Sequence, residues 1–206
     1  MYNVTVSEIV IFHSILGLRP SVRTLGARLS ESGHRVHIPD LYLGEGPFDT
    51  YSAAAAHQKT VGFKELLARA TTAVETLPTD LFYAGFSAGC APAQILGAQR
   101  AGARGVVLMH GGSALPTLRI GSWPSEVPVQ VHCAERDPFC DRDQLAELVT
   151  AVRSDGAAAE WFEYPLSSHL FTDAELPDEY DEPFATLVTE RVAKFVAEGR
   201  RGRAVL

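Results

Sequence analysis

Hydrophobic residues along the chain alternate between two patterns. Short, nearly continuous apolar runs rich in β-branched residues are typical of strands that are buried on both faces of a sheet. Between these runs, apolar residues recur every three or four positions, as Val22, Leu25 and Leu29 do, which predicts amphipathic helices. The apolar runs predict six strands, over residues 4–13, 36–41, 81–84, 105–110, 129–133 and 158–164. The helical patterns cover residues 20–33, 53–76 with a break at Gly62, 88–100, 143–153 and 184–198.

The alternation of strands and helices indicates an α/β fold with a doubly wound, mostly parallel six-stranded sheet that helices cover on both faces. The chain has 206 residues and neither an internal repeat nor a linker-like stretch, so we expect one domain over residues 1–206. Residues 111–128 and 167–183 show no regular pattern and are predicted to be long loops. Ligands of such sheets bind beyond the carboxyl ends of the strands, which is where we expect the chemistry.

Composition and charge narrow the classes of partner. The net charge of −7 argues against a nucleic-acid-binding surface. No apolar stretch reaches the roughly 20 residues that span a bilayer, and the first residues do not resemble a signal peptide. The three cysteines form no disulfide framework, so we expect free thiols in a reducing cytoplasm. The basic stretch at residues 199–203 is expected to be a solvated end.

The cysteines and histidines of the chain are considered as metal ligands. The spacing His132-x7-Cys140, with Cys133 beside it, matches no structural zinc pattern. We therefore expect no metal site. Cys90, in the first turn of a predicted helix, is expected to be a buried packing residue.

The segment Gly85-Phe86-Ser87-Ala88-Gly89 carries the pattern of a nucleophile elbow. A buried strand precedes it and a helix follows it with no room for a loop, so a serine is held at the apex of a sharp turn. Gly85 and Gly89 lack Cβ atoms, which lets the strand and the helix approach closely. The alternative is a serine that serves only as a turn residue or a helix N-cap. The strand-turn-helix context favours Ser87 as a nucleophile.

A serine nucleophile needs a general base and an acid that orients the base. His169 follows the last predicted strand, and the order Ser, Asp, His along the chain is typical of this architecture. Asp137, in the loop after the fifth strand, is the candidate acid. Asp141 or Asp143 is expected to cap the next helix, and Glu135 is a weaker rival. The other histidines, which we expect to be structural, solvated or cleft-lining residues, are His34, His37, His57, His110 and His132.

The remaining site residues are predicted to lie at the same edge of the sheet, beyond the carboxyl ends of the strands. The oxyanion of the reaction is expected to accept hydrogen bonds from the backbone N–H of Ala88, directly after the nucleophile, and of Ile15, after the first strand. Tyr42 and Trp123 lie in loops that either wall the pocket or anchor the packing. The residues predicted to contact substrate are His13, Ser14, Tyr42, His110 and Phe171.

Several motifs, spread in order over nearly the whole chain, resemble the dienelactone hydrolase family of α/β hydrolases. The motifs are Phe12-His13-Ser14-Ile15-Leu16-Gly17-Leu18-Arg19-Pro20, Pro39-Asp40-Leu41-Tyr42, Gly85-Phe86-Ser87-Ala88-Gly89, Arg136-Asp137-Pro138-Phe139 and His169-Leu170-Phe171. The resemblance implies an α/β-hydrolase fold without a large lid domain. It also implies the hydrolysis of lactones or small esters without a cofactor.

Two positions depart from the family pattern. Better-known members carry a cysteine nucleophile where Ser87 stands, and a glutamate that helps control the thiol where Ser14 stands. A serine forms no thiolate that a carboxylate must tune, so the two changes together favour an ordinary Ser-His-Asp mechanism. The arginines that bind a substrate carboxylate in such relatives have no secure match here. We therefore predict a carboxylesterase or lactonase whose partner is a small-molecule ester or lactone.

Two alternatives to ester or lactone hydrolysis stay open at this point. The first is acyl transfer or thioester hydrolysis on the same three side chains. The second is a catalytically idle hydrolase fold that acts as a binding module. A cluster of acidic residues after His169 is either a solvated loop or a negative field that disfavours anionic substrates; its members are Asp173, Glu175, Asp178, Glu179, Asp181 and Glu182.

Overall fold

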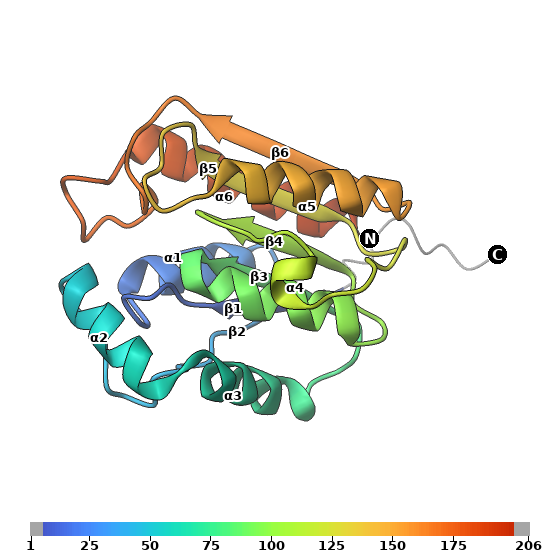
Figure 1. Cartoon of the computed structure of the whole chain (residues 1–206), viewed down its shortest axis with the longest axis horizontal. Helices are drawn as coiled ribbons and strands as arrows, with labels where there is room; N and C mark the ends of the chain where they lie inside the picture. The colour runs from blue at the N-terminus through green and yellow to red at the C-terminus, as the bar shows by residue number, and fades with distance from the viewer. Residues whose placement is uncertain (1–5, 200–206) are drawn as a thin grey trace.

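The computed structural model describes residues 6–199 and contains a six-stranded sheet with the order β2-β1-β3-β4-β5-β6 (Figure 1). Every neighbouring pair of strands is parallel, so the predicted mostly parallel sheet is parallel throughout. This arrangement confirms the α/β-hydrolase fold. The strands are β1 (Glu8–Phe12), β2 (Arg35–His37), β3 (Leu81–Phe86), β4 (Gly105–Met109), β5 (Val129–Ala134) and β6 (Ala159–Tyr164).

Two predicted strands are shorter by several residues in the structure. The first, predicted over residues 4–13, begins at Glu8, and residues 4 and 5 lie outside the described part of the chain. The second, predicted over residues 36–41 with an end near Pro39, spans only Arg35–His37. Pro39 has no N–H to donate to a neighbouring strand, so the ladder ends before it. Beyond Gly199, the predicted basic end also lies outside the described residues.

The helices follow the predicted order with small shifts at their ends. Gly62, with a φ of 80°, separates two helices where the break was predicted, because a left-handed residue ends one helix and redirects the chain. The helices are α1 (Pro20–Glu31), α2 (Tyr51–Val61), α3 (Phe63–Glu75), α4 (Cys90–Gln99), α5 (Arg142–Ser154) and α6 (Glu182–Glu198), with short 3-10 turns η1 (Ser87–Gly89) and η2 (Pro116–Leu118).

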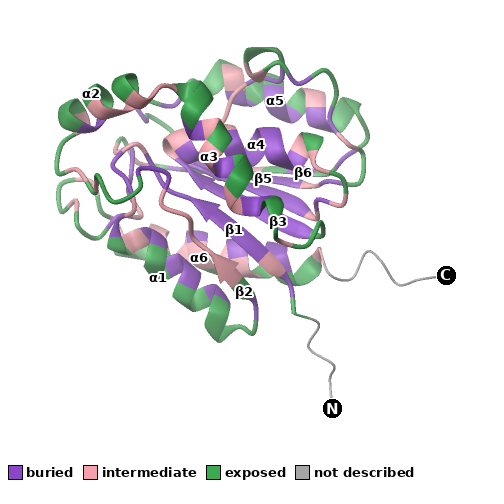
Figure 2. Cartoon of the chain, turned by 90° about the horizontal axis from the view of Figure 1, so that it is seen from below, coloured by how far each residue is buried: buried purple, intermediate pink, exposed green. Residues whose placement is uncertain are grey.

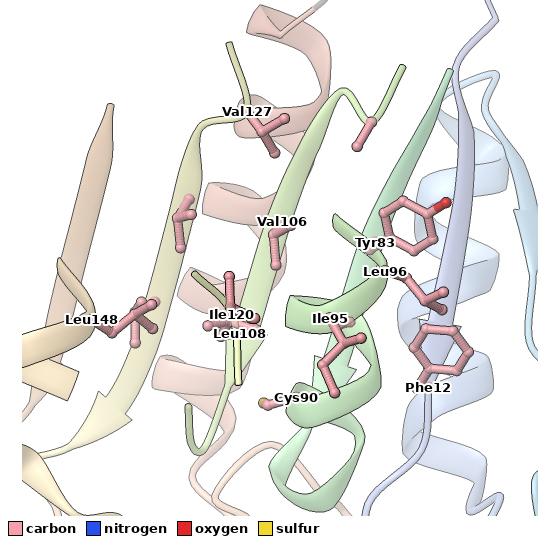
Figure 3. Packing of buried hydrophobic residues seen from close by; sticks show 14 of the residues in the cluster. Phe12, Tyr83, Cys90, Ile95, Leu96, Val106, Leu108, Ile120, Val127 and Leu148 are labelled. Carbon is pink, nitrogen blue, oxygen red and sulfur yellow. The ribbon is translucent and has the colours of Figure 1, made fainter. Parts of the chain in front are cut away.

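Helices cover both faces of the sheet, as a doubly wound fold requires (Figure 2). On one face, α3, α4 and α5 pack on the sheet through residues such as Leu96 and Leu148 (Figure 3). On the other face, α1 and α6 pack through residues such as Leu29 and Val192. The strands are buried on both sides, which explains why their sequences read as continuous apolar runs.

The order of the strands places a switch point between β1 and β3. The chain leaves β1 toward β2 on one side and later returns to β3 on the other, so the loops after β1 and β3 diverge. Diverging loops leave a crevice at the carboxyl ends of the strands, and a ligand is expected to bind there. Within residues 6–199 the connections carry no large inserted lid. None of the helices in this range combines the length and the apolar content needed to cross a bilayer.

Candidate active site

Ser87 stands at the turn between β3 and α4, with a φ of 50°. Few residues other than glycine adopt this conformation, and such strain is concentrated at functional sites. The flanking glycines make the turn possible. A Cβ atom on Gly85 would lie 2.2 Å from the carbonyl oxygen of Gly89, and one on Gly89 would lie 2.5 Å from that of Phe12. The spacing Gly-x-Ser-x-Gly is therefore a steric requirement of the start of α4 lying against the ends of β1 and β3.

The structure brings the side chains of Ser87, His169 and Asp137 together. The Ser87 hydroxyl lies 2.7 Å from Nε2 of His169. On the other side of the ring, Nδ1 of His169 lies 2.7 Å from one carboxylate oxygen of Asp137 and 2.9 Å from the other. A carboxylate only accepts, so Nδ1 carries the proton and Nε2 is left to accept the hydroxyl proton. Both His169 and Asp137 are buried, which shields these hydrogen bonds from water.

The loop after β5 holds the Asp137 carboxylate in place. One of its oxygens accepts a hydrogen bond of 2.8 Å from the backbone N–H of Phe139. The other candidate acids form no hydrogen bond with His169. The Asp141 side chain accepts from the backbone of Asp143 and Gln144 and caps α5, as predicted. Glu135 is exposed, and only Asp137 of the candidate acids contacts His169.

Ser87 and His169 open onto a cavity of about 590 Å³. Ile15 and Ala88, the residues predicted to donate backbone N–H groups to an oxyanion, both line it. An aromatic wall is formed by Tyr51, in the first turn of α2, and Phe139, whose rings lie 5.2 Å apart. The residues that line the cavity are Ile15, Tyr51, Ala55, Ser87, Ala88, Cys90, Ala91, His110, Gly111, Gly112, Ser113, Thr117, Phe139, Cys140, Asp141, Gln144 and His169.

His110 is the one member of the predicted substrate-contacting set that lines this cavity. It follows β4 with a φ of 63°, and its Nε2 forms a hydrogen bond of 2.7 Å with the Thr172 hydroxyl. Burial lowers the pKa of His110 well below the ordinary histidine value, with a further contribution from the neighbouring His169. A neutral ring is therefore placed 6.1 Å from the His169 ring, centroid to centroid.

The other four predicted substrate contacts lie elsewhere, because the fold uses their polar groups internally. Nε2 of His13 accepts from the Leu41 N–H, and Oγ of Ser14 accepts from the Leu16 N–H. Tyr42 donates its hydroxyl proton to the carbonyl oxygen of Ile15. These three side chains line a separate hollow of only about 20 Å³.

Phe171 is fully buried in the core between the sheet and α6, with its ring 4.6 Å from that of His110. It supports the cavity from behind rather than lining it. Trp123 is likewise a packing anchor, buried and with its indole N–H donated to the Val127 carbonyl oxygen. Cys90 is buried as predicted, and burial raises the pKa of its thiol.

Two of the acidic residues after His169, Asp173 and Glu179, are structural anchors, which neither interpretation of the sequence anticipated. Asp173 is buried in an ion pair with Arg19, at the start of α1. Glu179 accepts from the Leu170 N–H at 2.6 Å and from the Tyr51 hydroxyl at 2.8 Å. Through these contacts the segment after His169 is tied to α1 and α2, and the imidazole is held over Ser87.

Tyr51, Thr172 and Arg19 were not predicted as site or supporting residues. No pattern in the sequence signals them, since a helix-terminal tyrosine or a loop threonine is common and their partners lie far away in the chain. Phe139 did carry a signal in the sequence, because it lies in a loop two positions after the candidate acid. In the structure its side chain is 63% exposed and lines the cavity.

Comparisons with known proteins bear on the fold and the family of the chain. No curated protein matches the sequence. Among solved structures, a dienelactone hydrolase-like promiscuous phosphotriesterase from metagenomic libraries has a TM-score of 0.74 at 20% identity, covering 93% of this chain and 86% of its own. A structure described as m3DLH has a TM-score of 0.76 at 21% identity, covering 96% and 89%. A thermophilic esterase from Thermogutta terrifontis has a TM-score of 0.69 at 16% identity, covering 98% and 86%.

These structural similarities are below 25% identity and establish the α/β-hydrolase fold. The family assignment rests on the sequence itself. The profile of the dienelactone hydrolase family matches residues 2–199, which is nearly the whole chain. The chain therefore belongs to the dienelactone hydrolase family.

Proposed function

We propose that the protein is a serine hydrolase that cleaves small, neutral carboxylic esters or lactones without a cofactor. The proposal depends most on one observation, the hydrogen-bonded series from the Ser87 hydroxyl through His169 to Asp137 at the wall of a large cavity. Family membership makes a hydrolase the expected activity. The three buried free thiols support the expected cytoplasmic location.

In the acylation step, Oγ of Ser87 attacks the carbonyl carbon of the substrate while Nε2 of His169 takes the hydroxyl proton. Asp137 keeps the proton on Nδ1 and stabilises the imidazolium that forms. The carbonyl oxygen becomes an oxyanion, which accepts from the backbone N–H groups of Ile15 and Ala88. His169 then protonates the leaving alkoxide, and an acyl-enzyme remains on Ser87.

Deacylation repeats these steps with water in place of Ser87. His169 removes a proton from the water, the hydroxide attacks the acyl carbon, and the proton returns to Oγ of Ser87 as the acid leaves. For a lactone the leaving alkoxide stays attached to the acyl group, so one product, a hydroxy acid, is released. Each step uses only the three side chains, the two backbone N–H groups and water.

The lining of the cavity favours a neutral substrate. Among the described residues that line it, none is a lysine or an arginine, whereas Asp141 contributes a carboxylate. A substrate carboxylate would therefore meet no opposite charge there. Tyr51 and Phe139 supply an apolar wall beside His169, which suits a small alkyl or aromatic group of the ester.

A panel of esters and lactones, run on the wild type and Ser87→Ala, tests the proposal. We expect Ser87→Ala to lower kcat by at least about 10³-fold while its far-ultraviolet circular dichroism stays unchanged. Ser21→Ala, on α1 outside the cavity, is the matched control. Within the panel, neutral esters should be turned over faster than esters that carry a carboxylate.

Covalent labelling separates the proposal from its alternatives. A fluorophosphonate should label the wild type and Ser21→Ala but not Ser87→Ala, because labelling requires an activated hydroxyl. A folded wild-type protein that resists the reagent and hydrolyses no member of the panel would indicate the idle binding module. Products formed with an added alcohol or amine in preference to water would indicate acyl transfer.

A further inference from the structure

Two cysteines gather around the buried carboxylate that orients His169. Cys133 lies on β5 and Cys140 precedes α5, and both are free and buried. Their sulfur atoms and a carboxylate oxygen of Asp137 all lie within 4.8 Å of one another. The Cys133 thiol lies 3.9 Å from Oδ2 of Asp137. The end of β5 and the loop that follows it thus turn two sulfur ligands and one oxygen ligand toward a common point.

This donor set suits a thiophilic divalent cation. Zinc binds thiolate sulfur at about 2.3 Å and carboxylate oxygen at about 2.0–2.2 Å, so neighbouring ligands in a tetrahedral site lie roughly 3.5–3.8 Å apart. The three groups therefore need to approach one another by roughly 1 Å. Three protein ligands leave a fourth position for water, as in open zinc sites. We propose that Cys133, Asp137 and Cys140 form an inhibitory site for zinc and similar thiophilic cations such as cadmium.

The spacing that was set aside in the sequence paired the two cysteines with His132, and the fold keeps that histidine away from them. Nδ1 of His132 lies 2.8 Å from the Tyr164 hydroxyl, and its Nε2 lies 2.9 Å from the Gln130 side-chain oxygen. The histidine is therefore engaged on the side of β5 away from the cysteines, because neighbouring residues of a strand point to opposite faces. Asp137, which no zinc pattern includes, takes its place. Cys140 lines the Ser87 cavity, so a cation has a path from solvent to the site.

Binding at this site interferes with His169, and this step rests on the proposed function. Oδ2 of Asp137, which faces Cys133, is also the oxygen that lies 2.7 Å from Nδ1 of His169. A cation that coordinates this carboxylate withdraws its negative charge from the imidazole and competes for the same lone pairs. His169 is then a poorer base, and hydrolysis slows. Release of the cation by a chelator restores the charge and the rate.

Cadmium titration of the full chain tests the site without relying on activity. Cadmium bound to thiolates gives a charge-transfer absorption in the ultraviolet, which reports ligation by sulfur directly. We expect one cadmium ion per chain to produce this band in the wild type, with a phosphine reductant in place of dithiols, which bind metals themselves. Cys133→Ser and Cys140→Ser should each weaken binding by at least about tenfold. Cys90→Ser, which removes an equally buried thiol of the same cavity wall, should bind as the wild type does.

Activity is then measured for each variant relative to its own metal-free rate. Saturating cadmium or zinc should lower wild-type turnover by at least about tenfold, reversibly with a chelator, and should affect Cys133→Ser and Cys140→Ser far less. Absence of the band in the wild type, or equal binding and inhibition in all variants, would overturn the site. Circular dichroism melts identify any variant that fails to fold, and Cys133→Ala and Cys140→Ala then replace it. A wild type that binds cadmium through both thiols but hydrolyses nothing before metal is added would leave the site standing and refute the proposed function.

Discussion

Two loops at the same edge of the sheet each carry a buried histidine, and the fold uses them differently. His13, after β1, is bound by backbone groups, with the Leu41 N–H 3.0 Å from Nε2 and the Ser14 carbonyl oxygen 2.8 Å from Nδ1. His169, after β6, is bound by side chains of two other loops, Ser87 and Asp137. The first ring joins the loop after β1 to the segment at Leu41, and the second presents a lone pair to the Ser87 hydroxyl beside a cavity.

The difference shows that a position at the reactive edge does not by itself make a residue part of the site. Burial lowers the pKa of His13 and keeps its ring neutral, so the ring acts as a fixed donor and acceptor for the backbone. The loop after β1 turns its side chains into the fold and presents only Ile15 to the cavity. The Tyr42 hydroxyl, bonded to the Ile15 carbonyl oxygen, helps to hold that residue in place.

The comparison predicts the largest effect for His169→Gln. We expect kcat to fall by about 10³–10⁴-fold, because no group remains to take the Ser87 proton, while the midpoint of unfolding moves little. Steady-state kinetics and a thermal melt measure the two quantities. Turnover within tenfold of the wild type would remove His169 from the mechanism.

Arg19→Met should give the next largest effect, since Arg19 connects the two loops. It follows the loop after β1, pairs with Asp173 beyond His169, and donates to the Phe48 carbonyl oxygen. Its loss leaves a buried carboxylate unpaired, which we expect to lower the free energy of unfolding by about 3–5 kcal/mol. Urea unfolding measures the change.

The double variant Arg19→Met/Asp173→Leu is the control for this ion pair. Because it removes both charges, it should recover much of the stability that Arg19→Met loses. A double variant no more stable than Arg19→Met would show that packing of the arginine, and not the unpaired charge, dominates.

His13→Leu should show the opposite pattern to His169→Gln. Leucine fills the space but leaves the Leu41 N–H without its acceptor, so we expect a loss of about 1–3 kcal/mol in the free energy of unfolding. The kcat of the folded fraction should stay within about tenfold of the wild type, since the ring does not line the Ser87 cavity. A fall in kcat as large as that of His169→Gln, with unchanged stability, would contradict this assignment.

The last effect, which is confined to acid, concerns a third buried histidine, His132, which lies in neither loop. Burial, with a contribution from Arg191, lowers its pKa from 6.5 to about 3. Between these values the unfolded chain binds a proton that the folded chain does not, so the free energy of unfolding falls as the pH falls through this range. The slope that His132 adds is about 1.4 kcal/mol per pH unit.

His132→Gln should make the dependence of stability on pH shallower by about this slope between pH 6 and about 4, whatever its effect at neutral pH. Urea unfolding at a series of pH values gives the two curves. Parallel curves for the wild type and His132→Gln would mean that the histidine does not titrate on unfolding.

Much of the fold was predictable because it depends on local patterns. Continuous apolar runs, helical spacing and the break at Gly62 each act within a few residues, and the corresponding elements were placed to within a few positions. The elbow was predictable for the same reason, since Gly85 and Gly89 are required by contacts at a single turn. The early end of β2 has a local cause too, since Pro39 has no N–H with which to continue the ladder.

The sequence by itself determined the family, the order of the strands and helices, and the choice of Ser87, Asp137 and His169 as the candidate reactive groups. Only the tertiary structure decided which side chains face the cavity. It turned His13, Ser14 and Tyr42 inward, used Asp173 and Glu179 as anchors, and gathered Cys133 and Cys140 around Asp137. The physical reason is that every buried polar group must find a partner, and those partners come from segments far apart in the chain, which no local pattern records.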